Sequence, residues 1–413
     1  MVCAVGGQEL ANLNGTAREE NEDEEAQAQP HQSRIADHYG AALRLLATAI
    51  QKIVDTVELD YILGTLWLMV VYEQKFGDGY GSGLIIHLRG AGYLVQGRLQ
   101  NLARIIDRSK PCIFDEEELE AMSPRSGPED HWQISGFSAR MIIWISFLDG
   151  GAALNGIGGV FNEFLGQAMD GLAGDEVQSL IQGFRTIHRH SHAAFRETWG
   201  ASYPQAQLLE DMEIRHMFYL YGECGQLRYL LSKLAVVDWR NSPKAKAYLK
   251  RVACALNDVT VRYGDILEVA SSLQLVEGCP RRRYVTNIRF VVPQYNAVLL
   301  CFFRIARRRR PLNYRQRAAL RVILDLAHQA HSDVGEEGIL QVAWPLFVAA
   351  LETDDPVHRA WILERYQILS TQGQNYRRAN EALKVAFAEQ RLNERRLDFL
   401  QLVRRDDLDR FVI

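Results

Sequence analysis

The chain has 413 residues, of which 47% are hydrophobic and 24% are charged, and its formal net charge at pH 7 is −4. This composition is typical of a soluble globular protein and excludes a strongly basic nucleic-acid-binding chain. The longest strongly apolar run, residues 62–72, has about half the length that a bilayer-spanning helix requires, so we expect no membrane segment. The six cysteines are scattered, which predicts reduced thiols in an intracellular protein and neither a disulfide framework nor a zinc site.

Residues 1–33 are predicted to form a disordered acidic tail. Glutamate and aspartate dominate residues 19–25, and glutamine, alanine and Pro30 follow this block. Such a segment buries too little apolar surface to offset the entropy lost on ordering. We interpret it as a solvated tail. An acidic interaction tail is the alternative, which the lack of aromatic residues disfavours.

Apolar residues after residue 34 recur at spacings of three and four, which predicts a succession of helices. The predicted helices cover residues 35–50, 59–76, 84–94, 137–148, 177–198, 217–234, 245–255, 266–275, 296–304 and 315–330. A polar, proline-containing stretch at 116–131 predicts a surface loop. No strand pattern or fixed-period repeat is found. The fold class is therefore predicted to be all-α: a large array of many antiparallel helices without a sheet, in one domain over 34–405, with a C-terminal tail at 406–413.

Two patterns in the middle of the chain invite a cofactor or metal interpretation. The glycine-rich residues 155–159 follow a helical segment rather than a strand, so we interpret them as a helix-terminating loop and not as a nucleotide fingerprint. His188, His190 and His192 stand at alternate positions in a helical segment, where neighbouring members point about 200° apart. They cannot share one ion in a helix, and we expect an exposed polar face.

Two arginine clusters lie at 281–283 and at Arg307, Arg308, Arg309 and Arg310. The second cluster is either a nuclear-import signal or phosphate contact, or a set of cations that suits the dipole of a helix C-terminus. Four adjacent arginines exceed what dipole balance requires, and both interpretations stay open.

Residues 344–388 are predicted to form three packed helices. Asp355 is expected to cap the second helix, and Pro356 suits its first position. Trp344 and Trp361 are expected to be buried and close to each other, whereas Arg359 and Arg365 are expected to stay outside. The residues of this structural motif are Trp344, Pro345, Asp355, Pro356, Arg359 and Trp361.

Three stretches of the chain, in order, resemble the fungal-specific transcription factor domain, the regulatory region that follows a zinc binuclear cluster in fungal activators and repressors. The first is Leu66–Glu73 with the segment His87–Ala91, the second is Ala139–Asp149 with Gly158-Gly159, and the third is residues 344–386. The resemblance implies a helical regulatory domain in the nucleus, protein partners of the transcription machinery, a small-molecule effector and a homodimer. It implies no cofactor and no catalytic or metal-binding residue.

One feature of that family is not found in the sequence. The zinc cluster needs six cysteines beginning with a CxxC pair, and residues 1–60 contain Cys3 alone. We therefore expect no direct DNA binding by this chain through that route. An effector pocket is expected between the helices at 63–71, 142–148 and 344–351, lined mainly by apolar and aromatic side chains.

The alternative functions are a helical enzyme, similar to terpenoid synthases, and a helical scaffold. Asp406-Asp407-Leu408-Asp409 mimics an aspartate-rich magnesium motif, and Asp354-Asp355 offers a second acidic pair. Magnesium binding would require both groups to line one cavity beside substrate phosphates.

Overall fold

The computed structural model of the protein describes residues 1–6, 25–52, 56–99, 134–170, 173–237, 242–276, 278, 281–307, 311–393, 396–397 and 399–413. In these ranges the regular secondary structure is helical and contains no strand, which confirms the predicted all-α fold class. The predicted loop at 116–131 lies outside the described residues.

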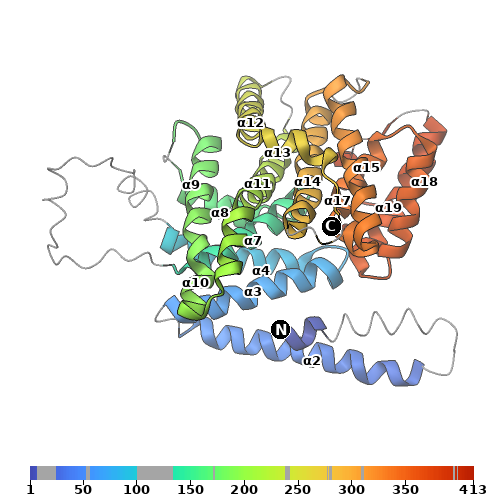
Figure 1. Ribbon diagram of the computed structural model, residues 1–413. Coiled ribbons are helices and arrows are strands. Elements are labelled where there is room, and N and C mark those ends of the chain that lie inside the picture. Colours follow the sequence, from blue (N-terminus) through green and yellow to red (C-terminus); the bar gives the residue numbers. More distant parts are fainter. Residues whose placement is uncertain are drawn as a thin grey trace, which may run out of the picture.

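The helices are best followed in chain order (Figure 1). They are α2 (Glu25–Ile50), α3 (Thr56–Phe76), α4 (Ser82–Leu99), α7 (Gly136–Leu154), α8 (Val160–Ala168), α9 (Glu176–His190), α10 (Ala194–Trp199), α11 (Gln205–Val236), α12 (Pro243–Arg262), α13 (Gly264–Val269), α14 (Arg282–Arg307), α15 (Tyr314–Val334), α16 (Glu336–Gln341), α17 (Ala343–Glu352), α18 (Pro356–Leu369), α19 (Gln374–Asn393) and α20 (Phe399–Leu402). Short 3₁₀ turns η2 (Ser191–Ala193), η3 (Gly200–Ser202) and η4 (Ala270–Ser272) extend three of them.

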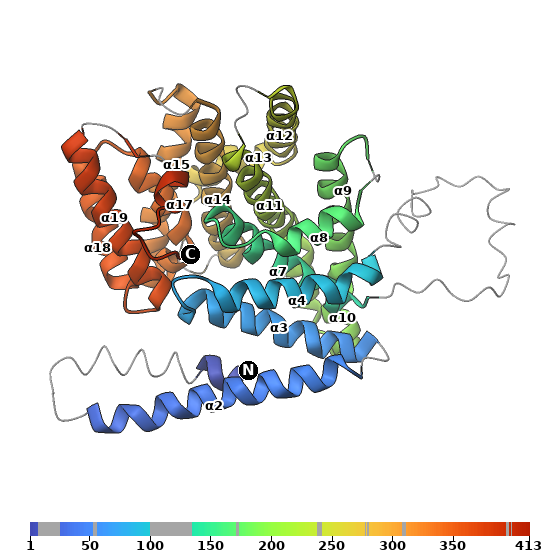
Figure 2. The same cartoon turned by 180° about the vertical axis from the view of Figure 1, so that it is seen from behind.

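The array has an N-terminal edge, a middle and a C-terminal end. Helix α2 lies along one edge beside α3 and α4, and α18 and α19 stand at one end (Figure 1, Figure 2). In the middle, α7 packs on α3 and on α11, α11 packs on α14, and α14 packs on α15. Helix α17 contacts α14, α15, α18 and α19, and α19 returns to contact α3. Elements that are far apart in the sequence therefore share one packed body.

The central pair, α7 and α11, runs parallel and departs from the predicted antiparallel pattern. Successive contacts follow the same order along both helices: the Phe147 ring stacks on Tyr221 with centroids 3.7 Å apart, and Gly150 then meets Gly225. A Cβ atom on Gly150 would lie 2.3 Å from the carbonyl oxygen of Gly225. Only glycine permits backbones to approach this closely, so the two helices touch at this point.

Helix starts are set by local side-chain chemistry. Ser135 accepts a hydrogen bond from the N–H of Ser138 at the start of α7, and Asp175 caps α9 in the same way. Asn313 and Gln316 form a reciprocal capping box at the start of α15. Each of these caps satisfies N–H groups that a helix leaves without an internal partner.

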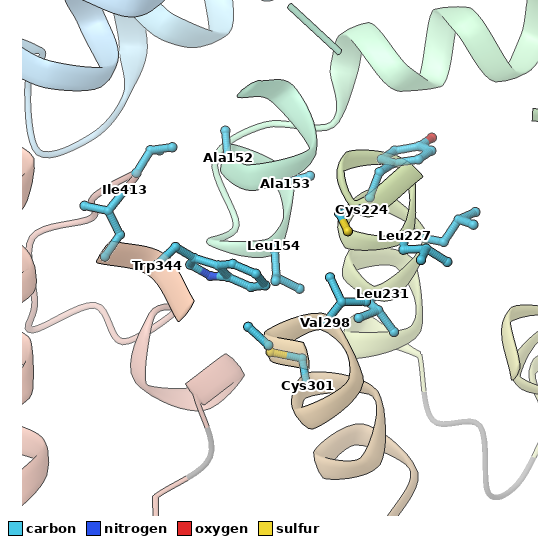
Figure 3. Packing of buried hydrophobic residues seen from close by; sticks show 14 of the residues in the cluster. Ala152, Ala153, Leu154, Cys224, Leu227, Leu231, Val298, Cys301, Trp344 and Ile413 are labelled. Atoms are coloured by element: carbon cyan, nitrogen blue, oxygen red, sulfur yellow. The ribbon is translucent and has the colours of Figure 1, made fainter. Parts of the chain in front are cut away.

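The helices share one large hydrophobic cluster. Leu63 of α3, Ile142 of α7 and Leu351 of α17 belong to it and are fully buried. Figure 3 shows its centre, where Trp344 of α17 and Leu154 of α7 converge with side chains of α11 and α14. The apolar breadth of these helices predicts this shared interior, because each must be covered on more than one side.

Among the residues that the structure describes, two helices are long and apolar enough to cross a membrane by length and composition alone. They are α7 and residues Arg282–Ala306 of α14, and 83% and 78% of their most apolar windows are buried inside the fold. Such burial is what core helices of a globular protein show.

Both ends of the described chain differ from the sequence expectation. Helix α2 begins at Glu25, inside the segment assigned to a disordered tail, because alanine, glutamine and glutamate there favour helix. Residues 7–24 lie outside the described residues. At the other end, the last three residues of the segment predicted as a tail pack inward: Phe411, Val412 and Ile413 are buried, and Asn155 donates a hydrogen bond of 2.7 Å to the carbonyl of Phe411.

Candidate functional site

The two tryptophans of the predicted C-terminal motif lie in different places. Trp344 is 2% exposed, and the Arg228 guanidinium of α11 lies 3.9 Å from its ring centroid. Trp361 is only half-buried and packs against His328 of α15, with ring centroids 3.9 Å apart and ring planes tilted by 32°. The expected burial is therefore confirmed for Trp344 and wrong for Trp361, because α18 turns the Trp361 ring toward α15. Pro345 is buried within α17.

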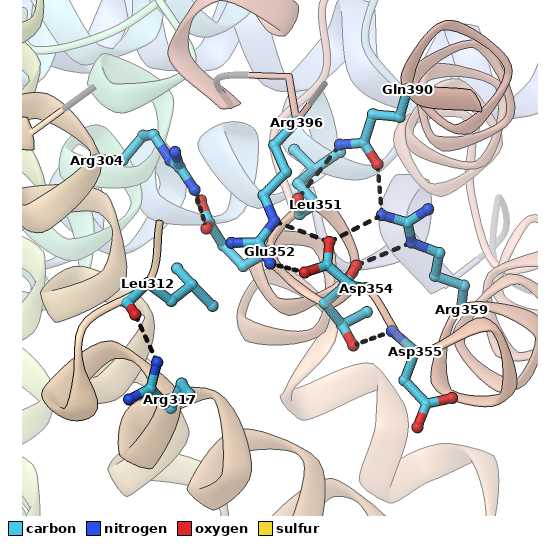
Figure 4. Close-up of polar contacts among 11 residues, drawn as sticks. Arg304, Leu312, Arg317, Leu351, Glu352, Asp354, Asp355, Arg359, Gln390 and Arg396 are labelled. Carbon is cyan, nitrogen blue, oxygen red and sulfur yellow. Dashed lines mark hydrogen bonds and ion pairs between the residues drawn. The ribbon is translucent and has the colours of Figure 1, made fainter. Parts of the chain in front are cut away.

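The turn between α17 and α18 is held by the residues that the sequence singles out there (Figure 4). Asp355 accepts a hydrogen bond of 2.8 Å from the N–H of Val357, and Pro356 is the first residue of α18. Arg359 donates to the carbonyl of Thr353 at 2.9 Å and to Gln390 of α19 at 2.8 Å. This arrangement joins α17, α18 and α19 and is structural.

Arg304 and Arg365 of the C-terminal half are buried, and Arg365 was expected to stay outside. Arg365 lies inside against α16, where it pairs with Glu336 at 2.5 Å. Arg304 of α14 donates from Nε to Glu352 of α17 at 2.8 Å, and both side chains are buried (Figure 4). A buried carboxylate requires such a partner, and these pairs fix how α14, α16, α17 and α18 meet.

The two acidic groups of the enzyme interpretation do not share a cavity. Asp354 and Asp355 line an open groove of about 520 Å³ beside α15, and Asp354 pairs with Arg396. None of Asp406, Asp407 and Asp409 is among the described residues lining that groove. Asp407 accepts a hydrogen bond of 2.8 Å from Arg405, and Asp409 lies 3.6 Å from Arg378. Among the described residues, no group of three histidine, cysteine or acidic side chains is placed to hold a metal ion.

The glycine turn after α7 closes around a buried carboxylate. Asp149 accepts hydrogen bonds from the N–H of Gly159 at 2.7 Å and from the N–H and side chain of Asn162, each at 2.8 Å. Burial raises the pKa of Asp149 to about 6, although these hydrogen bonds oppose the shift. A Cβ on Gly158 would lie 2.5 Å from that of Ala152, so the turn serves close packing, in agreement with the helix-terminating loop that the sequence predicts.

The alternate histidines are not the exposed face that the sequence suggests. His188 is 1% exposed, and its ring lies 5.4 Å from that of His192, while His190 contacts the carbonyl of Ile134. The α-helix ends at His190 and continues as a 3₁₀ turn. His188 and His192 are four positions apart, a spacing that places two side chains on the same face of a helical segment. Burial, followed by the charges of Arg215 and Arg140, lowers the pKa of His192 to about 3. Burial lowers the pKa of His188 well below its usual value.

His192 forms part of the wall of a cavity of about 220 Å³ between α7, α10, α11 and α14. Arg140 enters it from α7, where it is 6% exposed, and donates to the carbonyl of Ser191 at 3.2 Å. The described lining consists of Arg140, Trp144, His192, Phe195, Arg196, Tyr203, Leu208, Asp211, Arg215, Phe218 and Arg283. This is the candidate functional site, and we call it the arginine cavity.

The arginine cavity differs from the apolar effector pocket that the sequence predicts. Its walls combine aromatic rings with charged groups, and they come from α10 and α11 as well as from the expected helix at 142–148. A signal was present in the sequence: Arg140 is the one charged residue in the apolar segment 137–148. A charge inside such a helix needs a polar surrounding, which marks a site rather than plain core.

The remaining predicted site residues belong to the basic cluster. Arg307 is the last residue of α14. Arg308, Arg309 and Arg310 lie outside the described residues.

Comparison with known proteins identifies the family. The family model described as the fungal specific transcription factor domain matches residues 1–413, the whole chain. Neither the curated proteins nor the solved structures contain a match to it. The family match agrees with the all-helical fold and with the three stretches that carry the resemblance. The chain therefore belongs to the fungal specific transcription factor domain family.

Proposed function

We propose that the chain is the regulatory domain of a transcription factor, which acts in the nucleus on protein partners of the transcription machinery and responds to a small-molecule effector. The family match over the whole chain carries this proposal. Under this proposal, the domain does not itself contact DNA, and its role is regulatory rather than enzymatic. The packed helical array supplies surfaces for partners, and the arginine cavity supplies a place for an effector.

A tethering experiment tests this function. The chain is fused to a heterologous DNA-binding domain, and expression of a reporter with the matching operator is measured. We expect expression to rise or fall at least threefold relative to the DNA-binding domain alone. Equal expression from the two, with the fusion folded and present at the promoter, would refute the regulatory role. The purified chain without the added domain should leave operator DNA unshifted in a gel.

The nuclear setting gives the basic cluster its proposed role as an import signal. Replacing Arg307, Arg308, Arg309 and Arg310 with glutamine should move a fluorescently tagged chain toward the cytoplasm without changing its circular dichroism. The control removes two exposed arginines of α19, Arg377→Gln and Arg391→Gln, and should keep the tag in the nucleus. An unchanged distribution of the quadruple variant would leave the helix dipole as the reason for the cluster.

A further inference from the structure

The lining of the arginine cavity has an excess of positive charge. Four arginines line it, whereas Asp211 is the one carboxylate among its described lining residues. Glu210 lies outside the lining and offsets part of this excess by pairing with Arg283 at 2.8 Å. Asp211 accepts a hydrogen bond from the hydroxyl of Tyr203. The described surroundings thus leave cationic charge for which a bound anion would compensate.

Several hydrogen-bonding groups at the cavity are buried without a partner. In the described ranges this holds for Nε of Arg140, Nε of Arg215 and Nε2 of His192. A buried polar group without a hydrogen-bond partner is costly, and native proteins leave few of them. Here three occur around one cavity, and two belong to guanidinium groups, whose fork of N–H donors matches a carboxylate.

The remaining walls are suited to a flat ring. The Arg140 guanidinium lies 5.6 Å from the centroid of Phe195 and 5.9 Å from that of Phe218, so aromatic faces flank the cation. Trp144 adds a third ring to the lining, and Trp67 of α3 packs against it with centroids 4.9 Å apart. The volume of about 220 Å³ is below the range of roughly 300–1,000 Å³ for drug-sized ligands, which favours a single-ring molecule.

We propose that the arginine cavity binds a small aromatic carboxylate. Its ring lies among Trp144, Phe195 and Phe218, and its carboxylate accepts hydrogen bonds from Arg140 and Arg215. The use of this ligand as an effector rests on the proposed regulatory function, but the binding itself does not.

Calorimetric titration of the purified full chain with three probes tests the ligand class. Benzoate carries the ring and the charge, benzamide keeps the ring without the charge, and acetate keeps the charge without the ring. We expect saturable binding of benzoate at one site, at least tenfold tighter than either other probe, which corresponds to about 1.4 kcal/mol. Benzamide binding as tightly as benzoate would overturn the role of the arginines, and equal affinity for acetate would overturn the role of the rings.

Variants then place the binding in the cavity. Arg215→Gln should weaken benzoate binding at least tenfold. Arg196→Gln, at an exposed position of the lining, should weaken it less and serves if the first variant does not fold. The matched control Arg262→Gln on α12, which pairs with Asp258, should leave the affinity unchanged. Failure of benzoate to bind the folded chain, or full affinity in both cavity variants, overturns the proposal. The reporter assay of the tethered chain without benzoate tests the regulatory function separately.

Discussion

Trp344 and Trp361 look equivalent in the sequence, and they differ in how much of each ring the fold covers. Trp344 is buried beneath Arg228, whereas Trp361 is half-buried against His328. Trp344→Ala should therefore lower the free energy of unfolding by about 3–5 kcal/mol, as removal of a buried large side chain does. Trp361→Ala should lower the free energy of unfolding by clearly less, because part of its ring is already exposed. Urea denaturation of both variants measures the difference, and equal costs would contradict the packing described for α17 and α18.

Acid sensitivity is expected at His188. It is buried against His192 and Tyr219, with Arg140 nearby, and its pKa is lowered. Below pH 6.5 the unfolded chain binds a proton at this histidine while the folded chain does not, so stability falls as pH falls. The fall should be about 1.4 kcal/mol per pH unit below about pH 6. His188→Phe should lose this part of the slope, as measured by denaturation between pH 7 and 5.

The comparison with His188→Phe isolates that effect from other groups. Asp149 has a raised pKa, so between its ordinary value and about pH 6 it stabilises the fold as pH falls, with the opposite sign. It is present in both proteins and cancels in the difference. If the free energy of unfolding depended on pH in the same way in both proteins, the pKa of His188 would not be lowered in the folded chain.

Buried charge is the feature at residue scale that the sequence predicts least well. Arg365 lies on a helix with a recognisable apolar face, and the usual expectation places arginine in solvent. Its burial depends on Glu336 arriving from another helix, which no local pattern encodes. The burial of Trp344 was easier to predict, because its neighbours in α17 are apolar on all sides and the helix must therefore lie in the interior.

At the scale of elements, the N-terminus of α18 depends on one cap. Asp355 accepts from the N–H of Val357, and Pro356 already has the backbone angle of a first helical residue. Asp355→Ala should lower stability by about 0.5–2 kcal/mol, whereas Asp355→Asn should lose little, since asparagine caps as well. Thermal melts of both variants give the comparison. A matching loss in the asparagine variant would point to a charge effect instead of the cap.

Most of the longer helices were predictable, but α8 (Val160–Ala168) was not predicted, and helix lengths were predicted poorly. The sequence predicts a helix over 296–304, whereas α14 runs from Arg282 to Arg307 and contains Pro293. A proline normally interrupts a helix, but α14 is covered by α11, α15 and α17, and this packing outweighs the local preference. The arginine cavity could not be predicted in full for the same reason, because its walls come from four helices.

At the scale of the whole molecule, residues 411–413 pack against the hydrophobic core. Phe411, Val412 and Ile413 are buried in the main cluster, and the Phe411 ring lies 5.2 Å from that of Phe347. Each buried side chain of this kind contributes about 1.5–3 kcal/mol. Deleting residues 411–413 should therefore lower the unfolding free energy by several kcal/mol. The control is Asp406→Ala, at an exposed position, which should leave the free energy of unfolding unchanged.

The close contact between Gly150 of α7 and Gly225 of α11 lies between two functional parts of the molecule. Before this point both helices reach the arginine cavity, through Arg140 and Arg215, and just beyond it Arg228 reaches Trp344. The two helices also meet through Phe147 and Tyr221 and through Gly151 and Arg228, so they pack against each other along a continuous interface. A displacement of either helix at the arginine cavity would therefore be transmitted along this interface toward Trp344, against which Arg228 packs.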